Sequence, residues 1–264
     1  YLLRMVMVDT HTHLYAEQFD EDRAEMIVRA IEAGVSRFYL PNIDSNSIAG
    51  MMELEKQYPN QFFPMMGLHP CSVKADYKKE LDIVEKWLND RPFVAVGEIG
   101  IDLYWDKTFF EEQKDAFRTQ IKWAKELNIP IVIHARDALD VIIDIVTEEK
   151  DDTLNGIFHC FTGTEEQAQK IADLDFYMGL GGVLTFKNAG LDKIAVNIPL
   201  NKIVLETDSP YLAPKPKRGK RNETAYILYV AKKLAEIKGL SLEEITKITT
   251  QNANKVFNYQ EVVY

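Results

Sequence analysis

Two histidines one residue apart follow a short apolar run near the start of the chain, in Val6-Met7-Val8-Asp9-Thr10-His11-Thr12-His13. Side chains alternate between the two faces of a strand, so His11 and His13 point to the same face. Neutral imidazole is a favoured ligand for zinc, iron, nickel and copper, whereas two neighbouring imidazoles fill an apolar core poorly. The pair alone fits a metal site and a pair of polar residues at a strand exit equally well.

All five histidines, and two acidic residues, lie at the C-terminal ends of apolar runs. Glu98 ends the run 93–98 and Asp208 ends the run 203–208. A carboxylate at the end of a Val/Ile-rich parallel strand is costly to bury without a partner. Four imidazoles and two carboxylates converging on one place are roughly what two divalent metal ions need as ligands. These six residues are His11, His13, Glu98, His134, His159 and Asp208.

The elements that position these residues alternate between apolar and amphipathic stretches. The predicted strands are 5–11, 36–43, 62–68, 93–99, 130–135, 155–160, 175–181 and 202–207, and helical spacing occurs over 22–33, 109–127, 138–147 and 164–173. Eight such units in about 250 residues predict an α/β fold, a (β/α)₈ TIM-type barrel, whose active site lies at the C-terminal ends of the strands. No Gly-rich phosphate loop follows a strand, which disfavours an open doubly wound sheet.

The C-terminal part of the chain adds helices to the barrel. Asn222 is expected to cap a helix that runs to about Ile237, and Ser241 with Glu244 forms the capping box of a second helix that ends near Phe257. The same pattern, Thr164 with Gln167, opens the helix 164–173. We expect a single domain over residues 5–260, with 1–4 a remnant foreign to the fold.

Composition narrows the class of protein. The chain has 264 residues and a net charge of −10, which argues against non-specific coating of nucleic acid by a basic surface. Only two cysteines occur, so a disulfide scaffold is excluded and a reducing cytoplasm is expected. No apolar run reaches the roughly 18 residues needed to cross a membrane, and no leader is recognisable. Nothing in the sequence indicates an obligate protein partner.

Five motifs in order resemble those of the TatD-type metal-dependent deoxyribonucleases, within the amidohydrolase-like barrel superfamily. The resemblance extends over about 8–257, with small departures at Thr162 and Thr224, neither of them a predicted ligand. The motifs are Asp9-Thr10-His11-Thr12-His13, Gly97-Glu98-Ile99-Gly100-Ile101-Asp102, His134-Ala135-Arg136-Asp137-Ala138, His159-Cys160-Phe161-Thr162-Gly163 and Glu206-Thr207-Asp208-Ser209-Pro210-Tyr211.

The resemblance implies a centre of two divalent metal ions, with Mg²⁺ or Mn²⁺ functional and Zn²⁺, Ni²⁺ or iron also able to bind. His11 and His13 with Asp208 would bind one ion, His134 and His159 the other, and Glu98 would bridge them. Two cations about 3.5–4 Å apart can share a water and clamp a phosphodiester. Asp208 is placed to take the proton of that water, so the predicted catalytic residues are Asp208 and Glu98.

Three further residues are predicted to bind substrate. The resemblance suggests that His69 contacts a phosphate, the alternative being a supporting hydrogen bond. Arg136 shares the inward face of His134, so it could bind phosphate or orient an acid. Arg218 is the strongest candidate in the basic run 215–221, which could instead be a solvated face.

Other polar and aromatic residues near the motifs have expected supporting roles. Glu206, and Asp9 similarly, would accept a hydrogen bond from a ligating histidine. Asp102 would shape the loop after Glu98, and Cys160 would point outward beneath the helices. The aromatic pairs Tyr104-Trp105 and Phe109-Phe110 could stack on the bases of a single strand or belong to the core.

The sequence therefore predicts a metal-dependent hydrolase of phosphodiester bonds, a deoxyribonuclease acting from the 3′ end on single-stranded or frayed DNA. An alternative on the same site is hydrolysis of amide, lactone or ester bonds, such as deacylation of an aminoacyl-tRNA, because a barrel fold alone does not choose the chemistry. A non-enzymatic scaffold is a third alternative, and the intact ligand set argues against it.

Overall fold

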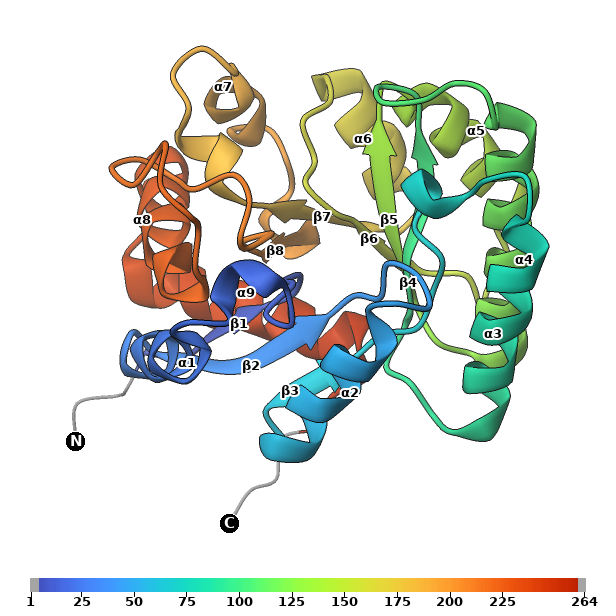
Figure 1. The fold of residues 1–264 in the computed structure, drawn as a ribbon. Coiled ribbons are helices and arrows are strands. Elements are labelled where there is room, and N and C mark those ends of the chain that lie inside the picture. The colour runs from blue at the N-terminus through green and yellow to red at the C-terminus, as the bar shows by residue number, and fades with distance from the viewer. Residues whose placement is uncertain (1–4, 261–264) are drawn as a thin grey trace.

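Strands and helices alternate along the chain in the computed structural model, which describes residues 5–260 (Figure 1). The strands are β1 Met7–Asp9, β2 Val35–Leu40, β3 Phe62–Pro64, β4 Val96–Asp102, β5 Ile131–Arg136, β6 Gly156–Phe158, β7 Tyr177–Leu180 and β8 Ile203–Leu205. The α-helices are α1 Arg23–Glu32, α2 Ile48–Gln57, α3 Tyr77–Asp90, α4 Phe110–Leu127, α5 Leu139–Glu149, α6 Glu165–Asp173, α7 Leu191–Ala195, α8 Ile227–Lys238 and α9 Leu242–Val256. Short 3₁₀ helices are η1 Glu17–Phe19, η2 Pro70–Ser72, η3 Gly182–Thr185, η4 Leu200–Lys202 and η5 Thr224–Tyr226.

The strands pair in parallel and in sequence order, β1 to β3 in one sheet and β4 to β8 in another. A parallel bridge from Met66 to Val96 joins β3 to β4. At the other seam, the backbone N–H of Thr10 donates to the carbonyl oxygen of Leu205 at 3.1 Å, which joins β1 to β8. Both seams are closed, so the fold is the predicted (β/α)₈ TIM-type barrel.

The barrel has two apolar layers. One lies between the strands and the surrounding helices, and it contains residues as far apart as Met7 and Ile245. The other fills the barrel interior at the N-terminal ends of the strands, where α9 lies against β1 and β8 (Figure 1). We call this second layer the floor; its members are Val8, Tyr39, Met65, Ala95, Val132, Ile157, Val204, Ala253, Val256 and Phe257. The opposite end of the barrel, at the C-terminal ends of the strands, is the mouth.

Most of the predicted strands differ from the observed ones in their limits, among them the one that precedes His69 and the one that contains Glu98. The predicted strand 62–68 corresponds to β3, which ends at Pro64, and only the bridge at Met66 continues the pairing. The predicted strand 93–99 begins and ends three residues too early, because β4 runs from Val96 to Asp102. Glu98 therefore lies within its strand, and its expected place at a strand end is wrong.

The predicted N-termini of two helices are confirmed where the sequence contains a capping box. Thr164 and Gln167 form a complete capping box at α6, and Ser241 and Glu244 form another at α9. The predicted cap at Asn222 is wrong, since its side-chain amide donates to the carbonyl oxygens of Thr207 and Tyr211 and the α-helix begins five residues later. Within residues 5–260, no helix combines the length and the apolar character that crossing a bilayer requires.

Candidate metal centre at the barrel mouth

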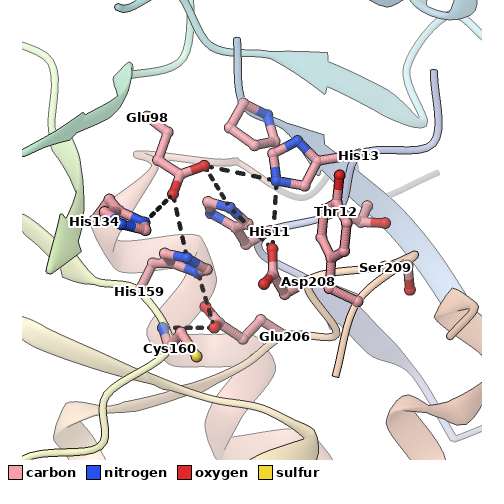
Figure 2. A network of polar contacts seen from close by, with 12 residues as sticks. His11, Thr12, His13, Glu98, His134, His159, Cys160, Glu206, Asp208 and Ser209 are labelled. Atoms are coloured by element: carbon pink, nitrogen blue, oxygen red, sulfur yellow. Dashed lines mark hydrogen bonds and ion pairs between the residues drawn. The ribbon is translucent and has the colours of Figure 1, made fainter. Parts of the chain in front are cut away.

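Every second residue of a strand faces the barrel interior, so a residue in the apolar floor is followed two positions later by a residue at the mouth. On β5, Val132 belongs to the floor and His134, two residues further on, reaches the mouth. Ile157 on β6 and His159 just beyond it repeat this arrangement. The structure brings the six residues predicted as metal ligands together there (Figure 2): His11, His13, Glu98, His134, His159 and Asp208.

Glu98 enters this cluster through an irregularity in β4. Gly97 pairs with Val132 and Ile99 with Ile133, so Glu98 is an extra residue in the ladder. A bulge of this kind re-aims the side chains that follow it. Ala95 faces the floor, and the side chain of Glu98, three residues further on, points into the mouth (Figure 2). A simple alternation of faces from Ala95 would point Glu98 the wrong way.

The carboxylate of Glu98 lies between two pairs of histidines (Figure 2). Oε2 is 3.1 Å from Nε2 of His11 and 3.6 Å from Nε2 of His13. Oε1 is 2.9 Å from Nδ1 of His134 and 3.3 Å from Nε2 of His159. Each oxygen of one buried carboxylate thus faces a different pair of the histidines predicted as ligands.

Asp208 joins the pair formed by His11 and His13. Its Oδ1 lies 3.3 Å from Nε2 of His13 and 3.6 Å from Nε2 of His11. Its backbone N–H donates to the carbonyl oxygen of His11 at 2.9 Å, which fixes the end of β8 to the segment after β1. The side chain of Asp208 is 15% exposed, against 2% for Glu98, so Asp208 is the more accessible carboxylate.

Three polar groups lie within hydrogen-bond distance of the ring nitrogens that point away from Glu98 and Asp208. Glu206 Oε1 lies 3.0 Å from Nδ1 of His159, which confirms the hydrogen bond predicted for Glu206. Asp102 Oδ2 lies 2.8 Å from Nε2 of His134, and the hydroxyl of Tyr15 lies 2.9 Å from Nδ1 of His13. Outer hydrogen bonds of this type fix the ring orientation and tautomer of metal-ligating histidines.

Asp102 and Asp9 behave differently from what their sequence positions suggested. Asp102 does shape the following loop, because its Oδ1 accepts the N–H groups of Tyr104 and Trp105, but its bond to His134 was missed. Its position four residues beyond Glu98 on the same inward face was the available signal. Asp9 bonds no imidazole; it accepts from the backbone N–H of His11 and from Thr207.

The electrostatics keep both central carboxylates ionised. Burial alone would raise the pKa of Glu98, but the surrounding histidines, with His11 foremost, hold that pKa well below its usual range. Burial also opposes ionisation of Asp208, and its hydrogen bond with His13 and the charges of nearby histidines lower its pKa. Two ionised, buried carboxylates at one point favour a cation between them.

The donor set fits divalent metal ions. Among residues 5–260, three groups have ligand atoms within 4.8 Å of one another: His11 with Glu98 and His159, His11 with His13 and Asp208, and His69 with Glu98 and His134. Imidazole nitrogen and carboxylate oxygen together suit zinc, nickel, iron and manganese, and the carboxylates suit magnesium. The partners behind His13, His134 and His159 leave one nitrogen of each ring facing the carboxylates.

A cavity of about 740 Å³ opens over the cluster, and two of the three predicted substrate-binding residues line it. His69 lies with Nε2 3.4 Å from Glu98 Oε1, and Arg136 lies at the edge. Arg218 is not among the described residues that line the cavity; its guanidinium lies over the ring of Phe186, 4.3 Å from the centroid. Of the same basic run, Arg221 is paired with Asp22.

The structure also shows the surroundings of Cys160 and of the two aromatic pairs. Cys160 lines the cavity instead of pointing outward beneath the helices, because its φ of 48° breaks the strand alternation directly after His159. Phe109 and Phe110 pack against the core, whereas Tyr104 and Trp105 are exposed at the mouth. The pair Phe109-Phe110 thus belongs to the core, whereas the pair Tyr104-Trp105 is exposed to solvent.

The chain has clear relatives along almost its whole length. The family model described as TatD related DNase matches residues 8–258. YabD of Bacillus subtilis (strain 168), named an uncharacterized metal-dependent hydrolase, is 42% identical over 253 residues, 96% of this chain and 99% of YabD. TatD of Salmonella typhimurium (strain LT2), named a 3′-5′ ssDNA/RNA exonuclease, is 31% identical over 264 residues, 98% of this chain and 100% of that protein.

A solved structure shows the same architecture. YJJV, a TatD homolog from Escherichia coli K12, matches with a TM-score of 0.90 and 28% identity, covering 96% of this chain and 98% of YJJV. The chain belongs to the TatD related DNase family and is a metal-dependent hydrolase of that family.

Proposed function

We propose that this hydrolase is a deoxyribonuclease that removes nucleotides from the 3′ end of single-stranded or frayed DNA. The observation that carries the proposal is the position of Glu98, each of whose carboxylate oxygens faces a separate pair of histidines. That arrangement is what a carboxylate bridging two metal ions requires. The printed function of the Salmonella relative, a 3′-5′ ssDNA/RNA exonuclease, supports the choice of substrate.

Within this proposal, His11, His13 and Asp208 would hold one divalent ion, His134 and His159 would hold the second, and Glu98 would serve both. When bound, two such ions supply Lewis acidity to the phosphoryl oxygens and lower the pKa of an attacking water. Mg²⁺ or Mn²⁺ is the proposed functional metal, and the same donors accept Zn²⁺, Ni²⁺ or iron.

Asp208 acts as the general base. It is ionised, since its pKa lies below the usual range, and its side chain is the more exposed of the two carboxylates. A group that accepts a proton must reach the attacking water and be unprotonated at the working pH. Glu98, almost fully buried and in contact with the imidazoles of all five histidines, has the positioning role instead.

His69 and Arg136 bind the phosphate. Burial lowers the pKa of His69, so its ring is neutral, and its Nδ1 accepts the backbone N–H of Cys71 at 3.0 Å. A neutral ring that accepts at Nδ1 carries its proton on Nε2. Nε2, which lies 3.4 Å from Glu98 Oε1 in the lining of the cavity, is therefore a hydrogen-bond donor, and a donor N–H suits a phosphate oxygen better than a metal ion. Arg136 adds a permanent positive charge at the same cavity. Arg218, which lies over Phe186, stays a prediction from the sequence.

Two broader proposals accompany this function. We place the enzyme in the cytoplasm, which the two free cysteines support. We also propose one domain over 5–260, which the continuity of the outer apolar layer from Met7 to Ile245 supports.

The test uses the purified chain and 5′-labelled oligonucleotides, with Mg²⁺, Mn²⁺ or Zn²⁺ added after chelation. We expect a ladder of products shortened from the 3′ end, no products in excess chelator, and no products from Asp208→Asn. An oligonucleotide with a phosphorothioate 3′ linkage should be resistant. The proposal is wrong if the metal-loaded protein cleaves no DNA strand form, and cleavage of misacylated tRNA or simple esters alone would establish the alternative hydrolase.

A further inference from the structure

Trp105 is a large aromatic side chain left exposed at the cavity that holds Glu98. At 69% it is the most exposed of the large hydrophobic side chains in residues 5–260. The indole also lines the cavity. On the opposite side, Tyr211, which follows β8, lines the same cavity and is 51% exposed. Exposed aromatic faces beside a catalytic cluster suggest a ligand with planar apolar surfaces.

The backbone at Trp105 is fixed relative to the cluster. One carboxylate oxygen of Asp102 accepts the N–H groups of Tyr104 at 3.0 Å and Trp105 at 3.3 Å. The other oxygen of Asp102 lies 2.8 Å from Nε2 of His134. A single buried carboxylate therefore ties the backbone of Trp105 and a candidate metal ligand together, so the indole projects from a point that is fixed relative to the reacting centre.

Tyr104 and Arg136 brace the indole from the side. The rings of Tyr104 and Trp105 meet at 88°, with centroids 4.8 Å apart. The guanidinium carbon of Arg136 lies 3.7 Å from the centroid of Tyr104 and 5.3 Å from that of Trp105. Because the two rings are perpendicular and Trp105 remains largely exposed, the bracing leaves much of the indole surface open to solvent.

Within the part of the chain that the structure describes, the positive charge beside this surface has no carboxylate partner. Among residues 5–260, no carboxylate lies within ion-pair distance of the Arg136 guanidinium. Its charge is thus available to an anionic ligand, although the chain as a whole carries a net charge of −10. A planar face next to an unpaired cation is complementary to a nucleotide, in which a base and a phosphate are joined through one sugar.

We infer that Trp105 stacks on an unpaired base of the substrate strand, next to the phosphodiester that is cleaved, with Tyr104 and Arg136 holding the indole in place. This inference rests on the proposed nuclease function and deepens it. A base inside a duplex is stacked on both sides and paired, so it can reach the indole only after unstacking. The contact thus makes the enzyme select unpaired 3′ ends, while the metal centre itself acts on any phosphodiester.

The test measures binding separately from cleavage. Replacing Trp87 and Trp123 by phenylalanine leaves Trp105 as the one tryptophan, since the chain has three. This protein, loaded with Mn²⁺, is titrated with oligo(dT) and with an abasic tetrahydrofuran oligomer of equal length and charge, both with non-cleavable phosphorothioate 3′ linkages. We expect quenching of Trp105 emission by oligo(dT) and binding about tenfold tighter than that of the abasic oligomer.

Variants of the otherwise unmodified chain then test whether this difference in affinity is due to the indole of Trp105. Trp105→Ala should remove the tenfold difference and the preference for single-stranded over blunt duplex ends, with bound metal unchanged. Trp105→Phe should keep most of both, because a ring remains. Leu127→Ala is the matched control, since Leu127 is also an exposed hydrophobic residue, 41% exposed at the far end of α4, and it should change neither.

The outcomes separate the two proposals. Equal affinity for oligo(dT) and the abasic oligomer, together with metal-dependent cleavage of DNA, overturns the stacking inference alone. An unchanged base preference in Trp105→Ala does the same. Failure of the unmodified, metal-loaded protein to cleave any oligonucleotide overturns the nuclease function and the inference with it.

Discussion

The mouth and the floor of the barrel are built from the same strands, yet they have opposite chemistry. Val132 and Ile157 lie in the floor, while His134 and His159, each two residues further along, reach the mouth. At the floor, α9 closes the barrel with apolar side chains, so water is excluded. At the mouth, the loops leave a cavity of about 740 Å³ above buried carboxylates and imidazoles.

Because of this difference, residues that determine stability and residues that determine activity lie on the same strand. Floor side chains gain free energy by leaving water, and removing them creates a cavity. The mouth collects charges whose burial costs free energy unless partners or cations compensate. Changes at the mouth should therefore affect metal binding and rate, and changes at the floor should affect the free energy of unfolding.

The largest expected effect is at the mouth. Glu98→Gln removes the negative charge between the two histidine pairs and keeps the shape of the side chain. We expect DNA cleavage to fall by about a thousandfold, since the loss of about 4 kcal/mol of charge stabilisation corresponds to that factor. Single-turnover assays and metal analysis at a fixed Mn²⁺ concentration measure it, and circular dichroism checks the fold. Cleavage within threefold of the unmodified enzyme would mean that Glu98 bridges no metal.

The matching change at the floor should lower the stability of the fold and leave the activity nearly unchanged. Phe257 is 7% exposed and stacks on Tyr39 with ring centroids 3.8 Å apart. Phe257→Ala should lower the free energy of unfolding by about 3–4 kcal/mol, as for other buried aromatic truncations. Urea denaturation monitors the loss. The turnover rate per folded molecule should change less than twofold, and a tenfold decrease would show that floor and mouth are coupled.

An intermediate effect is expected for the residues behind the ligands. Asp102→Asn keeps an oxygen that can accept the N–H groups of the loop, but it removes the charge that faces His134. Loss of such a partner typically weakens metal binding about 10–100-fold. Isothermal titration with Mn²⁺ measures this affinity, and Asp106→Asn, a loop carboxylate outside the cluster, is the control. Unchanged affinity in Asp102→Asn would restrict Asp102 to shaping its loop.

The sequence predicted the parts of this architecture that follow from local patterns. The barrel, the convergence of His11, His13, His134 and His159, and the capping boxes at Thr164 and Ser241 follow from strand alternation, apolar runs and backbone hydrogen-bond geometry. The helices α2, α3 and α7 were not predicted, although the spacing of Tyr77, Leu81, Val84 and Leu88 in α3 is helical.

Other features depend on contacts that no local pattern contains. The bulge at Glu98 is visible only against its pairing partner β5, so neither the limits of β4 nor the inward position of Glu98 relative to Ala95 follows from alternation. Asn222 has a common capping residue type, but the carbonyl groups of Thr207 and Tyr211 recruit its amide. The left-handed conformation of Cys160 similarly overrides the face that its neighbours predict.

The smallest expected effect tests whether the floor helix is stabilised locally. At α9 the hydroxyl of Ser241 accepts the backbone N–H of Glu244 at 3.2 Å, and Glu244 returns a bond to the N–H of Ser241 at 2.9 Å. Ser241→Ala should cost about 1 kcal/mol, which lowers the melting temperature by about 2–4 °C. Thr164→Ala removes the same motif from α6, a helix outside the floor, and should cost a similar amount. If Ser241→Ala also reduced Mn²⁺ affinity while Thr164→Ala did not, the position of α9 would control the mouth through the strands, and the separation of stability from activity would fail.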